Sequence, residues 1–347
     1  MNKELEDIEE IEHEDELQEK FLELDLIVDK GQDLLRIDKF LVNKMMGVTR
    51  TKIQSACETD LILVNGKQIK ANYKVHPEDH ILVYSYREPS QYEIIPENIP
   101  LDIFYEDEDM MVINKPPNMV VHPGNGNPNG TLVNAVAYYL QQKHTDKEAL
   151  DRIGLVHRID KDTSGLLLFG KTDEAVFKLS EQFKNHSAKR EYVALVWGNV
   201  EEDEGTIDVN IGRHQQFRKK FEIYPEADFG KTAITHYKVL ERFNYTTLIS
   251  CKLETGRTHQ IRVHMKSIGH TLFNDRTYGG EKILKGTVYT KYKQFVDNCF
   301  KLCPRQALHA KTIGFVHPRT GKEMMFESNL PDDMIAMIEK WRSYTVR

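Results

Sequence analysis

The stretch LVHRIDKDTSGLLLFGKT, Leu155 to Thr172, constrains the fold of this chain more than any other segment. Its apolar run, Leu166 to Phe169, has the length and composition of a buried strand. Immediately before this strand lie two charges of each sign within five residues: Arg158, Asp160, Lys161 and Asp162. A surface turn would explain these charges, and so would a catalytic carboxylate held against a rigid sheet. The choice between a surface turn and a catalytic carboxylate depends on other segments of the chain.

The composition is typical of a soluble protein with a sizeable core. The 347 residues suggest about two domains, and 40% of the residues are hydrophobic and 29% charged. We expect no transmembrane span, because no apolar run approaches the ~18 residues that a span requires. We also expect no signal peptide, because the N-terminus is acidic. Four cysteines are too few for a disulfide scaffold, so we expect reduced thiols in a cytoplasmic protein.

Charge is distributed unevenly along the chain. The net charge is -7, but residues 1–25 contain twelve Asp and Glu against two Lys, a net of -10. The remainder therefore carries 45 Lys and Arg against 42 Asp and Glu, a net of +3. A charge block of this kind predicts a flexible, solvated acidic tail over residues 1–30. A tail that competes with a polyanion for a basic groove is the alternative interpretation.

Residues 31–86 predict a small α+β domain. Apolar spacing predicts a helix from Leu34 to Leu41, with Asp38 and Lys39 on its polar face. The elements predicted after it are a basic helix from Thr49, a strand from Leu61 to Val64 that enters a hairpin turn at Asn65-Gly66, and a strand from Ile81 to Tyr84.

Basic residues of this domain can form a face that contacts RNA phosphates. They are Arg36, Lys39, Arg50, Lys52 and Lys67. The domain resembles the small RNA-binding domain named after ribosomal small-subunit protein S-four. The resemblance rests on Arg-x-Asp-x-x-Leu from Arg36, Thr-Arg-Thr-Lys-Ile from Thr49 and Val-Asn-Gly-Lys from Val64. A helical lid that does not touch RNA is the alternative.

The remaining residues form a linker and a large domain. Residues 87–100 contain three prolines and little periodicity, which predicts a linker. Residues 101–347 mix strands and helices without a regular βαβ rhythm. The clearest strands are Met110 to Ile113 and Val193 to Trp197, and the clearest helices are Ala175 to Phe183 and Asp333 to Trp341. We therefore expect an α+β fold with a mixed, largely antiparallel sheet flanked by helices and loops.

Tyr192 lies on one of these predicted strands. Strand alternation places Tyr192, Ala194 and Val196 on one face. Tyr192 is then either a core residue or a ring that stacks on a planar ligand.

The segment Gly256 to His264 offers a partner for Asp160. The same alternation places Gln260, Arg262 and His264 on one face of a strand. If that face meets the turn around Asp160, Arg262 can pair with the carboxylate and keep it ionised. A plain structural ion pair would have the same spacing.

Neither a metal nor a nucleotide cofactor is expected. His259, His264 and His270 lack the HExxH spacing or a comparable ligand spacing. The loop from Val121 to Gly130 contains three glycines but fits neither the Walker pattern nor a dinucleotide fingerprint.

Nearly the whole chain after its tail resembles the RluA family of pseudouridine synthases, in particular the bacterial members that modify large-subunit ribosomal RNA. Gly154 to Thr172 is similar to the HRLD-x-x-TSG motif, with Ile159 in place of the usual Leu. Other similar segments are Tyr105 to Asp109, Asn114 to Pro117, Val121 to Gly124, Lys189 to Gly198, Gly256 to His264, Tyr278 to Gly280 and Arg305 to Lys311. His270 to Asp275 departs, because it lacks the usual proline and the usual glycine before the aspartate. The conformation of that loop is left open.

The resemblance implies an isomerase that detaches uracil N1 from ribose C1′ and rebonds the base through C5, without metal or cofactor. Asp160 would be the catalytic carboxylate, by a covalent or a glycal route. Tyr192 would stack on the uracil, and Arg262 would hold Asp160 ionised. Arg158 would fill the space left by the flipped base. Further expected RNA contacts are His157, Arg36, Arg50, Lys52, Arg213, Lys219, Lys220, Arg257 and His259.

The expected partner is 23S ribosomal RNA or an assembling large ribosomal subunit, with no membrane and a monomeric protein. Two other functions fit parts of the sequence. A non-catalytic RNA-binding or ribosome-assembly factor would use Asp160 and Arg262 as a structural pair. A glycoside hydrolase also works with a carboxylate at an anomeric carbon, but it needs a second carboxylate about 5–10 Å away. The motif offers only Asp162 for that role.

Overall fold

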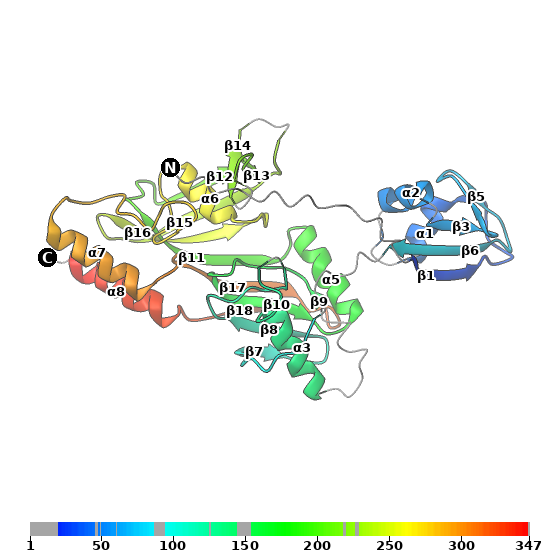
Figure 1. The fold of residues 1–347 in the computed structure, drawn as a ribbon, viewed down its shortest axis with the longest axis horizontal. Coiled ribbons are helices and arrows are strands. Elements are labelled where there is room, and N and C mark those ends of the chain that lie inside the picture. Colours follow the sequence, from blue (N-terminus) through cyan, green and yellow to red (C-terminus); the bar gives the residue numbers. More distant parts are fainter. Residues whose placement is uncertain are drawn as a thin grey trace, which may run out of the picture. The chain divides into compact units, whose positions relative to one another are not determined.

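The computed structural model describes residues 20–45, 48, 50–59, 61–86, 94–124, 126–143, 154–217, 220–225 and 229–345. The chain divides into two compact units, Met1–Glu93 and Ile94–Arg347. Each unit has its own sheet, as the ribbon in Figure 1 shows. Each also has its own hydrophobic core. The expected α+β class is therefore confirmed. No helix within the described ranges is long and apolar enough to cross a membrane.

The small unit is built on a four-stranded antiparallel sheet of order β1-β6-β3-β4. Its strands are β1 (Lys20–Ile27), β6 (His80–Tyr86), β3 (Ile62–Val64) and β4 (Lys67–Gln68). The predicted hairpin turn is confirmed, because Asn65 and Gly66 adopt positive φ angles of 51° and 75° between β3 and β4. Two-residue turns of this handedness match the twist of the flanking strands.

Strand β1 occupies residues that we expected in the acidic tail, so a tail extending to residue 30 is wrong for Lys20–Ile27. Leu24 and Leu26 pack against the core of the small unit, whereas Glu23 and Asp25 are exposed. This alternation is a strand signal that the high local charge concealed. Residues 1–19 of the predicted tail lie outside the described residues.

The first helix, α1 (Ile37–Lys44), begins three residues later than predicted, because Leu35–Arg36 form the short strand β2, which pairs with β5 (Lys74–Val75). Asp38 is fully buried, so its placement on a polar face was wrong. Its carboxylate accepts hydrogen bonds from Arg36 Nε (3.1 Å), Arg50 Nε (2.9 Å) and Gln54 Nε2 (3.0 Å). Arg50 and Gln54 belong to α2 (Arg50–Glu58), so Asp38 joins the two helices.

The hydrogen bonds to Asp38 predict a stability that depends on pH. Burial alone would raise the pKa of Asp38, but the bonds from Gln54, Arg50 and Arg36 hold it well below its usual range. Because the pKa is lowered on folding, the contribution is present above the unfolded pKa of about 4 and is lost at lower pH. We expect Asp38→Asn to destabilise the small unit by about 1–3 kcal/mol at pH 7. Hydrogen exchange of α1 and α2 in the full chain, corrected for intrinsic rates, measures this.

The matched control for Asp38→Asn is Asp25→Asn. Asp25 is an exposed carboxylate of the same unit and pairs with His80. Asp25→Asn should change the hydrogen-exchange protection of α1 and α2 little, because exposed ion pairs contribute little to stability. Equal protection of both helices in wild type and Asp38→Asn would contradict the proposed role of Asp38.

The large unit contains a ten-stranded sheet whose main path runs β12-β15-β16-β11-β17-β10-β8-β7. Its strands are β7 (Ile103–Glu106), β8 (Met110–Lys115), β9 (Gly154–Leu155), β10 (Ser164–Gly170), β11 (Lys189–Trp197), β12 (Glu204–Asp208), β15 (Ile234–Arg242), β16 (Thr246–Leu253), β17 (Leu308–Val316) and β18 (Glu323–Glu327). Only β10 and β17 pair in parallel among the described strands. The expected mixed, largely antiparallel sheet is confirmed.

Helices and one hairpin surround this sheet. The helices are α3 (Leu132–Lys143), α5 (Asp173–Lys184), α6 (Gln260–Ser267), α7 (Thr290–Leu302) and α8 (Asp332–Thr345). The hairpin consists of β13 (Asn210–Arg213) and β14 (Phe221–Tyr224). Residues 94–100 of the predicted linker belong to the large unit, because Ile94 packs against its core and Glu97 N donates to Asn134 O. Residues 87–93 lie outside the described part of the chain.

Strand β10 is the predicted buried strand, and it lies between β8 and β17. Leu167 and Phe169 pack into one core cluster, while Leu166 and Leu168 pack into a second cluster that includes Leu179 of α5. A strand buried on both faces is held in position from both sides. Gly165 at its start has a φ of 117°, and a Cβ there would lie 2.2 Å from Ala310 O of β17. The glycine is therefore required for the close parallel pairing.

Candidate active site

The turn that carries Asp160 connects β9 to β10, and two buried cations hold its main chain. Lys115 is fully buried at the end of β8, and its Nζ donates to Lys161 O (2.9 Å), Pro116 O (2.7 Å) and Met119 O (2.8 Å). Arg305 Nη1 donates to Asp162 O (3.0 Å). Burial, together with the charge of Arg305, lowers the pKa of Lys115 to about 7. The carbonyls of the two residues after Asp160 are thus fixed.

Arg262 holds the Asp160 side chain and is itself held by a second carboxylate. Its Nη1 donates to Asp160 Oδ2 at 2.8 Å. Its Nε and Nη2 donate to Asp275 Oδ2 (2.7 Å) and Oδ1 (2.9 Å), a bidentate pair. The Asp275 side chain is fully buried, whereas 22% of the Asp160 side chain is exposed. Asp275 therefore orients the guanidinium through Nε and Nη2. The more exposed Asp160 accepts a hydrogen bond from Nη1.

The predicted contact between Arg262 and Asp160 is present. The predicted strand around Arg262 is wrong, because these residues form a helix. Arg262 lies on helix α6 (Gln260–Ser267). Gln260 and His264 do share a face, because both bond to Thr235 Oγ1, yet they lie at helical i,i+4 spacing and Arg262 points elsewhere. Ile261 packs into the core one turn before Met265, which is also helical spacing. Period 2 and period 3.6 are hard to separate over so few residues.

Tyr192 joins the pair in one pocket. Asp160, Tyr192 and Arg262 all line a cavity of about 590 Å³. Tyr192, Ala194 and Val196 share the core side of β11, as strand alternation predicts. Only 7% of Tyr192 is exposed, and burial raises the pKa of its phenol. The tyrosine is a core residue that also forms part of the pocket wall, so the two interpretations of its position are compatible.

His259 borders the same carboxylate. It precedes α6 in the left-handed conformation (φ 59°), and its Nε2 lies 3.9 Å from Asp160 Oδ2. Its Nδ1 lies 2.8 Å from the Tyr278 hydroxyl, which accepts the Phe221 N–H (3.0 Å). If the hydroxyl donates to Nδ1, the proton of neutral His259 resides on Nε2 and faces the carboxylate. Burial lowers the pKa of His259 and thus favours this neutral form.

The other predicted RNA contacts of the large unit are spread over two regions. Arg158 is exposed at the pocket, and Arg257, whose Nε donates to Thr232 O (2.9 Å), also lines it. On the β13–β14 hairpin, Arg213 lies over the Phe221 ring and Lys220 over the Phe217 ring. Lys219 lies outside the described residues.

His157 is built into the pocket wall. Its ring stacks on Phe183 at 4.4 Å, and its Nε2 accepts the N–H of Leu168 on β10. Burial lowers its pKa to about 3, so the ring is neutral. These contacts favour a structural role for His157 over the expected RNA contact.

In the small unit, Arg36 and Arg50 both bond to Asp38, and their side chains remain 42% and 47% exposed. They can therefore contact RNA while they hold the buried carboxylate. The side chain of Lys52 lies outside the described part of the structure.

The loop from His270 to Asp275 is now explained. Asn274, at the position where the resembling family more often has glycine, adopts a φ of 59°. Asparagine tolerates this left-handed conformation better than most residues. Its side chain also donates to Cys303 O (2.7 Å) and Phe300 O (3.2 Å), which a glycine could not do. The departure from the pattern keeps Asp275 in position against Arg262.

Four residues of the site had no role assigned from the sequence: Lys115, Asp275, Tyr278 and Arg305. Each lies in a segment that carried the family resemblance or departed from it, and spacing alone gave no partner. The partners that place them in the site are distant in sequence: Asp275 lies 13 positions from Arg262, Lys115 46 from Lys161, and Arg305 143 from Asp162. Only the fold brings them together.

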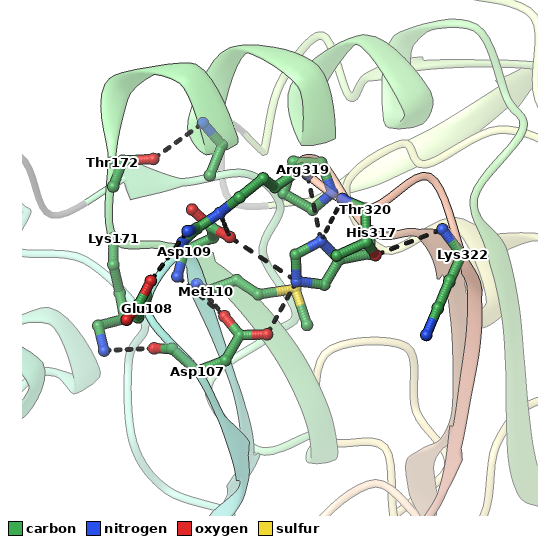
Figure 2. A network of polar contacts seen from close by, with 12 residues as sticks. Asp107, Glu108, Asp109, Met110, Lys171, Thr172, His317, Arg319, Thr320 and Lys322 are labelled. Atoms are coloured by element: carbon green, nitrogen blue, oxygen red, sulfur yellow. Dashed lines mark hydrogen bonds and ion pairs between the residues drawn. The ribbon is translucent and has the colours of Figure 1, made fainter.

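Another cluster of ionisable groups lies at the opposite ends of the central strands, where Asp107, Asp109 and His317 converge (Figure 2). His317 Nδ1 accepts the backbone N–H groups of Arg319 (3.1 Å) and Thr320 (3.2 Å), so its Nε2 carries the proton and donates to Asp107 Oδ2 (2.9 Å). Arg319 Nε donates to Asp109 Oδ2 at 2.6 Å. Both imidazole nitrogens are therefore occupied, and the cluster fits a structural ion-pair network rather than a metal centre.

The other histidines that were considered as metal ligands do not converge in the described structure. His264 bonds to Thr235 Oγ1 and His270 to Trp197 O, while His259 bonds to Tyr278. All four cysteines are buried and free.

Comparison with known proteins defines the class of protein. The sequence matches the RNA pseudouridylate synthase family over residues 109–267 and the S4 domain over residues 35–81. The fold is similar to human RNA pseudouridylate synthase domain containing 4, with a TM-score of 0.54 at 20% identity over 69% of this chain and 92% of that chain. The fold and the sequence thus define an RNA pseudouridine synthase, an isomerase of uridine.

Similarity to bacterial relatives places the chain more narrowly. It is 44% identical over 92% of its length to an uncharacterized RNA pseudouridine synthase of Chlorobaculum parvum, of which 97% is covered. It is 41% identical over 89% of its length to the ribosomal large subunit pseudouridine synthase D of Nitrosomonas europaea, of which 85% is covered. The chain belongs to the RluA family of RNA pseudouridine synthases and carries an N-terminal S4 domain.

We predict that Asp275→Asn destabilises the large unit by about 3–5 kcal/mol, because it removes one partner of a buried ion pair. The variant should also slow pseudouridine formation, because Arg262 loses its bidentate anchor. Unfolding in urea followed by tryptophan fluorescence measures the first effect, since both tryptophans, Trp197 and Trp341, lie in this unit.

Asn274→Gly is the matched control for Asp275→Asn. Glycine keeps the left-handed backbone and loses only the two side-chain hydrogen bonds, so we expect a smaller effect of about 1–2 kcal/mol. An Asp275→Asn variant no less stable than Asn274→Gly would rule out the proposed anchoring of Arg262.

Proposed function

We propose that Asp160 is the carboxylate that acts at the ribose C1′ region of a flipped uridine. The observation that carries this proposal is the 2.8 Å contact from Arg262 Nη1 to Asp160 Oδ2 inside the pocket that Tyr192 also lines. Both neighbours of this carboxylate, Arg262 and His259, approach Oδ2. Within the described residues no hydrogen bond or ion pair engages the other oxygen, Oδ1, which is left to face a substrate. A carboxylate that is held at one oxygen and open at the other suits either a nucleophile or a base.

The roles of the neighbouring residues follow from this assignment. Tyr192 stacks on the detached uracil and keeps it in the pocket while it turns from N1 to C5. Arg262 keeps Asp160 ionised and oriented. Arg158, exposed at the pocket, enters the duplex space that the flipped base leaves, which offsets part of the unstacking energy of a few kcal/mol.

The substrate that we propose is uridine in large-subunit (23S) ribosomal RNA, free or in an assembling subunit. The name of the Nitrosomonas europaea relative, ribosomal large subunit pseudouridine synthase D, supports this substrate. The S4 domain supplies a second RNA contact through the exposed parts of Arg36 and Arg50. We further propose a monomeric, cytoplasmic enzyme.

Glycoside hydrolysis is disfavoured by the second carboxylate of the site. Asp275 bonds to Arg262 and is fully buried, so it is not free to activate a water or protonate a leaving group. The remaining alternative is an assembly factor without catalysis. It differs from the proposed enzyme in that the purified wild-type protein would form no pseudouridine.

Asp160→Asn keeps the shape of the side chain and removes its charge. We expect at least a 10²–10⁴-fold loss of pseudouridine formation, the range for removal of a catalytic acid or base, with RNA affinity largely retained. Purified wild type and variant are incubated with a large-subunit ribosomal RNA transcript, and pseudouridine is mapped by chemical labelling and primer extension. Appreciable turnover by the variant would refute the assignment of Asp160, and no product with wild type would favour the assembly factor.

His259 gives an independent test of how Asp160 is held. Gln retains an N–H donor near the position of Nε2, whereas Asn retains only a group near Nδ1. We expect His259→Gln to keep most of the single-turnover rate and His259→Asn to lose several-fold, because Asn withdraws the N–H that faces Asp160 Oδ2 at 3.9 Å, a contact worth about 1 kcal/mol or less. A purely structural role predicts the opposite order, because asparagine is better suited to the left-handed conformation of residue 259. RNA affinity, measured separately, should be the same for both.

A further inference from the structure

Arg190 is a half-buried cation that the proposed reaction does not use. It lies two residues before Tyr192 on β11, so both side chains point to the same side of the strand, and both line the pocket of Asp160. Its Nη2 donates to Glu254 O at a long 3.3 Å. Its Nε is buried and has no hydrogen-bond partner in the described structure.

No carboxylate compensates this charge among the described residues. Glu254, whose carbonyl Arg190 contacts, directs its carboxylate to His236 at 2.6 Å. Burial lowers the pKa of Arg190, which expresses the unfavourable desolvation of its charge. A half-buried guanidinium with a buried donor that lacks a partner and with no ion pair costs free energy, so such an arrangement suggests a site that an anion completes.

The surroundings of Arg190 fix its guanidinium in place. It lies 5.4 Å from the centre of the Phe183 ring, whose own stacking partner is His157. At Gly256 an added Cβ would lie 2.6 Å from Arg190 Nη1, so the absence of a side chain there gives the guanidinium its space. These contacts hold the plane of the side chain by packing. Among the described residues, Nη2 alone of its donor atoms makes a hydrogen bond, the long one to Glu254 O.

The charge of the pocket lining fits an anionic ligand. Five lining residues are Arg or Lys and one is a carboxylate, Asp160. The five are Arg158, Lys184, Arg190, Arg257 and Arg262. Arg262 is already neutralised by its carboxylates, whereas Arg190 is not.

We propose that Arg190 is the binding site for one RNA backbone phosphate adjacent to the flipped uridine. Arginine recognises phosphate through paired N–H donors, and a phosphate would satisfy the donors that the protein leaves open. With the base stacked on Tyr192, this contact would hold the nucleotide from its backbone side. The inference rests on the proposed function, because it takes the Asp160 pocket to be the reaction site.

The first test separates a ligand site from a structural role by stability. Arg190→Met keeps much of the side-chain length but removes the unpaired, half-buried charge. We expect its melting temperature to equal or exceed that of wild type, while RNA affinity falls roughly ten- to hundredfold. A melting temperature that drops while RNA affinity is retained would overturn the proposal. Arg190→Lys keeps a point charge without paired donors, so its RNA affinity should lie between that of wild type and that of Arg190→Met.

The second test identifies the phosphate. The probe is a stem–loop oligonucleotide around a uridine that the enzyme modifies in the large-subunit transcript, with one neutral methylphosphonate on either side of that uridine. One of the two substitutions should weaken binding to wild type but not to Arg190→Met, and the salt slope of the variant should fall by about 0.7–0.9. Equal effects of both methylphosphonates on wild type and variant, with an unchanged salt slope, would refute the site.

Arg342→Met serves as the control arginine, because it lies on α8 and pairs with Glu241 at the surface. It should leave affinity and salt slope unchanged. Asp160→Asn is measured beside these variants. If Asp160→Asn retains turnover, the proposed function fails and the pocket is not the reaction site. If Asp160→Asn is inactive and Arg190→Met binds as wild type does, only the phosphate site fails.

Discussion

The guanidinium of Arg262, shared between Asp160 and Asp275, is the interaction on which the site depends. A single arginine facing a single aspartate would use its paired donors on that aspartate and neutralise it. Here the bidentate geometry is taken up by the buried Asp275, and Asp160 receives one N–H. The three groups together carry a formal net charge of -1, so Asp160 is held in place while the charge of its carboxylate is only partly offset. That is what a carboxylate needs if it is to attack or deprotonate a sugar.

The backbone beneath this side chain is fixed by the same means. Lys115 and Arg305 direct buried N–H donors at the carbonyls of Lys161 and Asp162. Burial of Lys115 and, to a smaller extent, the nearby charge of Arg305 are unfavourable for its charged form, and they lower its pKa. The carbonyl groups offset part of this cost, because their partial negative charges face the two cations. The result is a turn with little freedom, attached to a strand that is packed on both faces.

Much of this could be predicted from the sequence, because the signals are local. The buried strand Leu166 to Phe169, the turn at Asn65-Gly66 and the face of Tyr192 all follow from patterns within a few residues. The pairing of Asp160 with Arg262 was predicted on an incorrect element, a strand in place of α6, because residues 260–264 satisfy both periods. Asp38 looked like a surface residue, because its partners on α2 cannot be identified before the helices are packed.

What the sequence could not reveal are contacts over long separations that determine register. Strands β8, β10 and β17 lie side by side, and Ser164 pairs with His309 where the Asp160 turn ends and β10 begins. At their other ends, Asp109, Lys171 and His317 join one polar network, with Lys171 N bonded to Asp109 O. A slip of one residue in any of these strands would turn its side chains to the opposite face. It would also break the polar contacts at both ends. The remote network therefore contributes to the geometry of Asp160 by fixing the strand from which its turn departs.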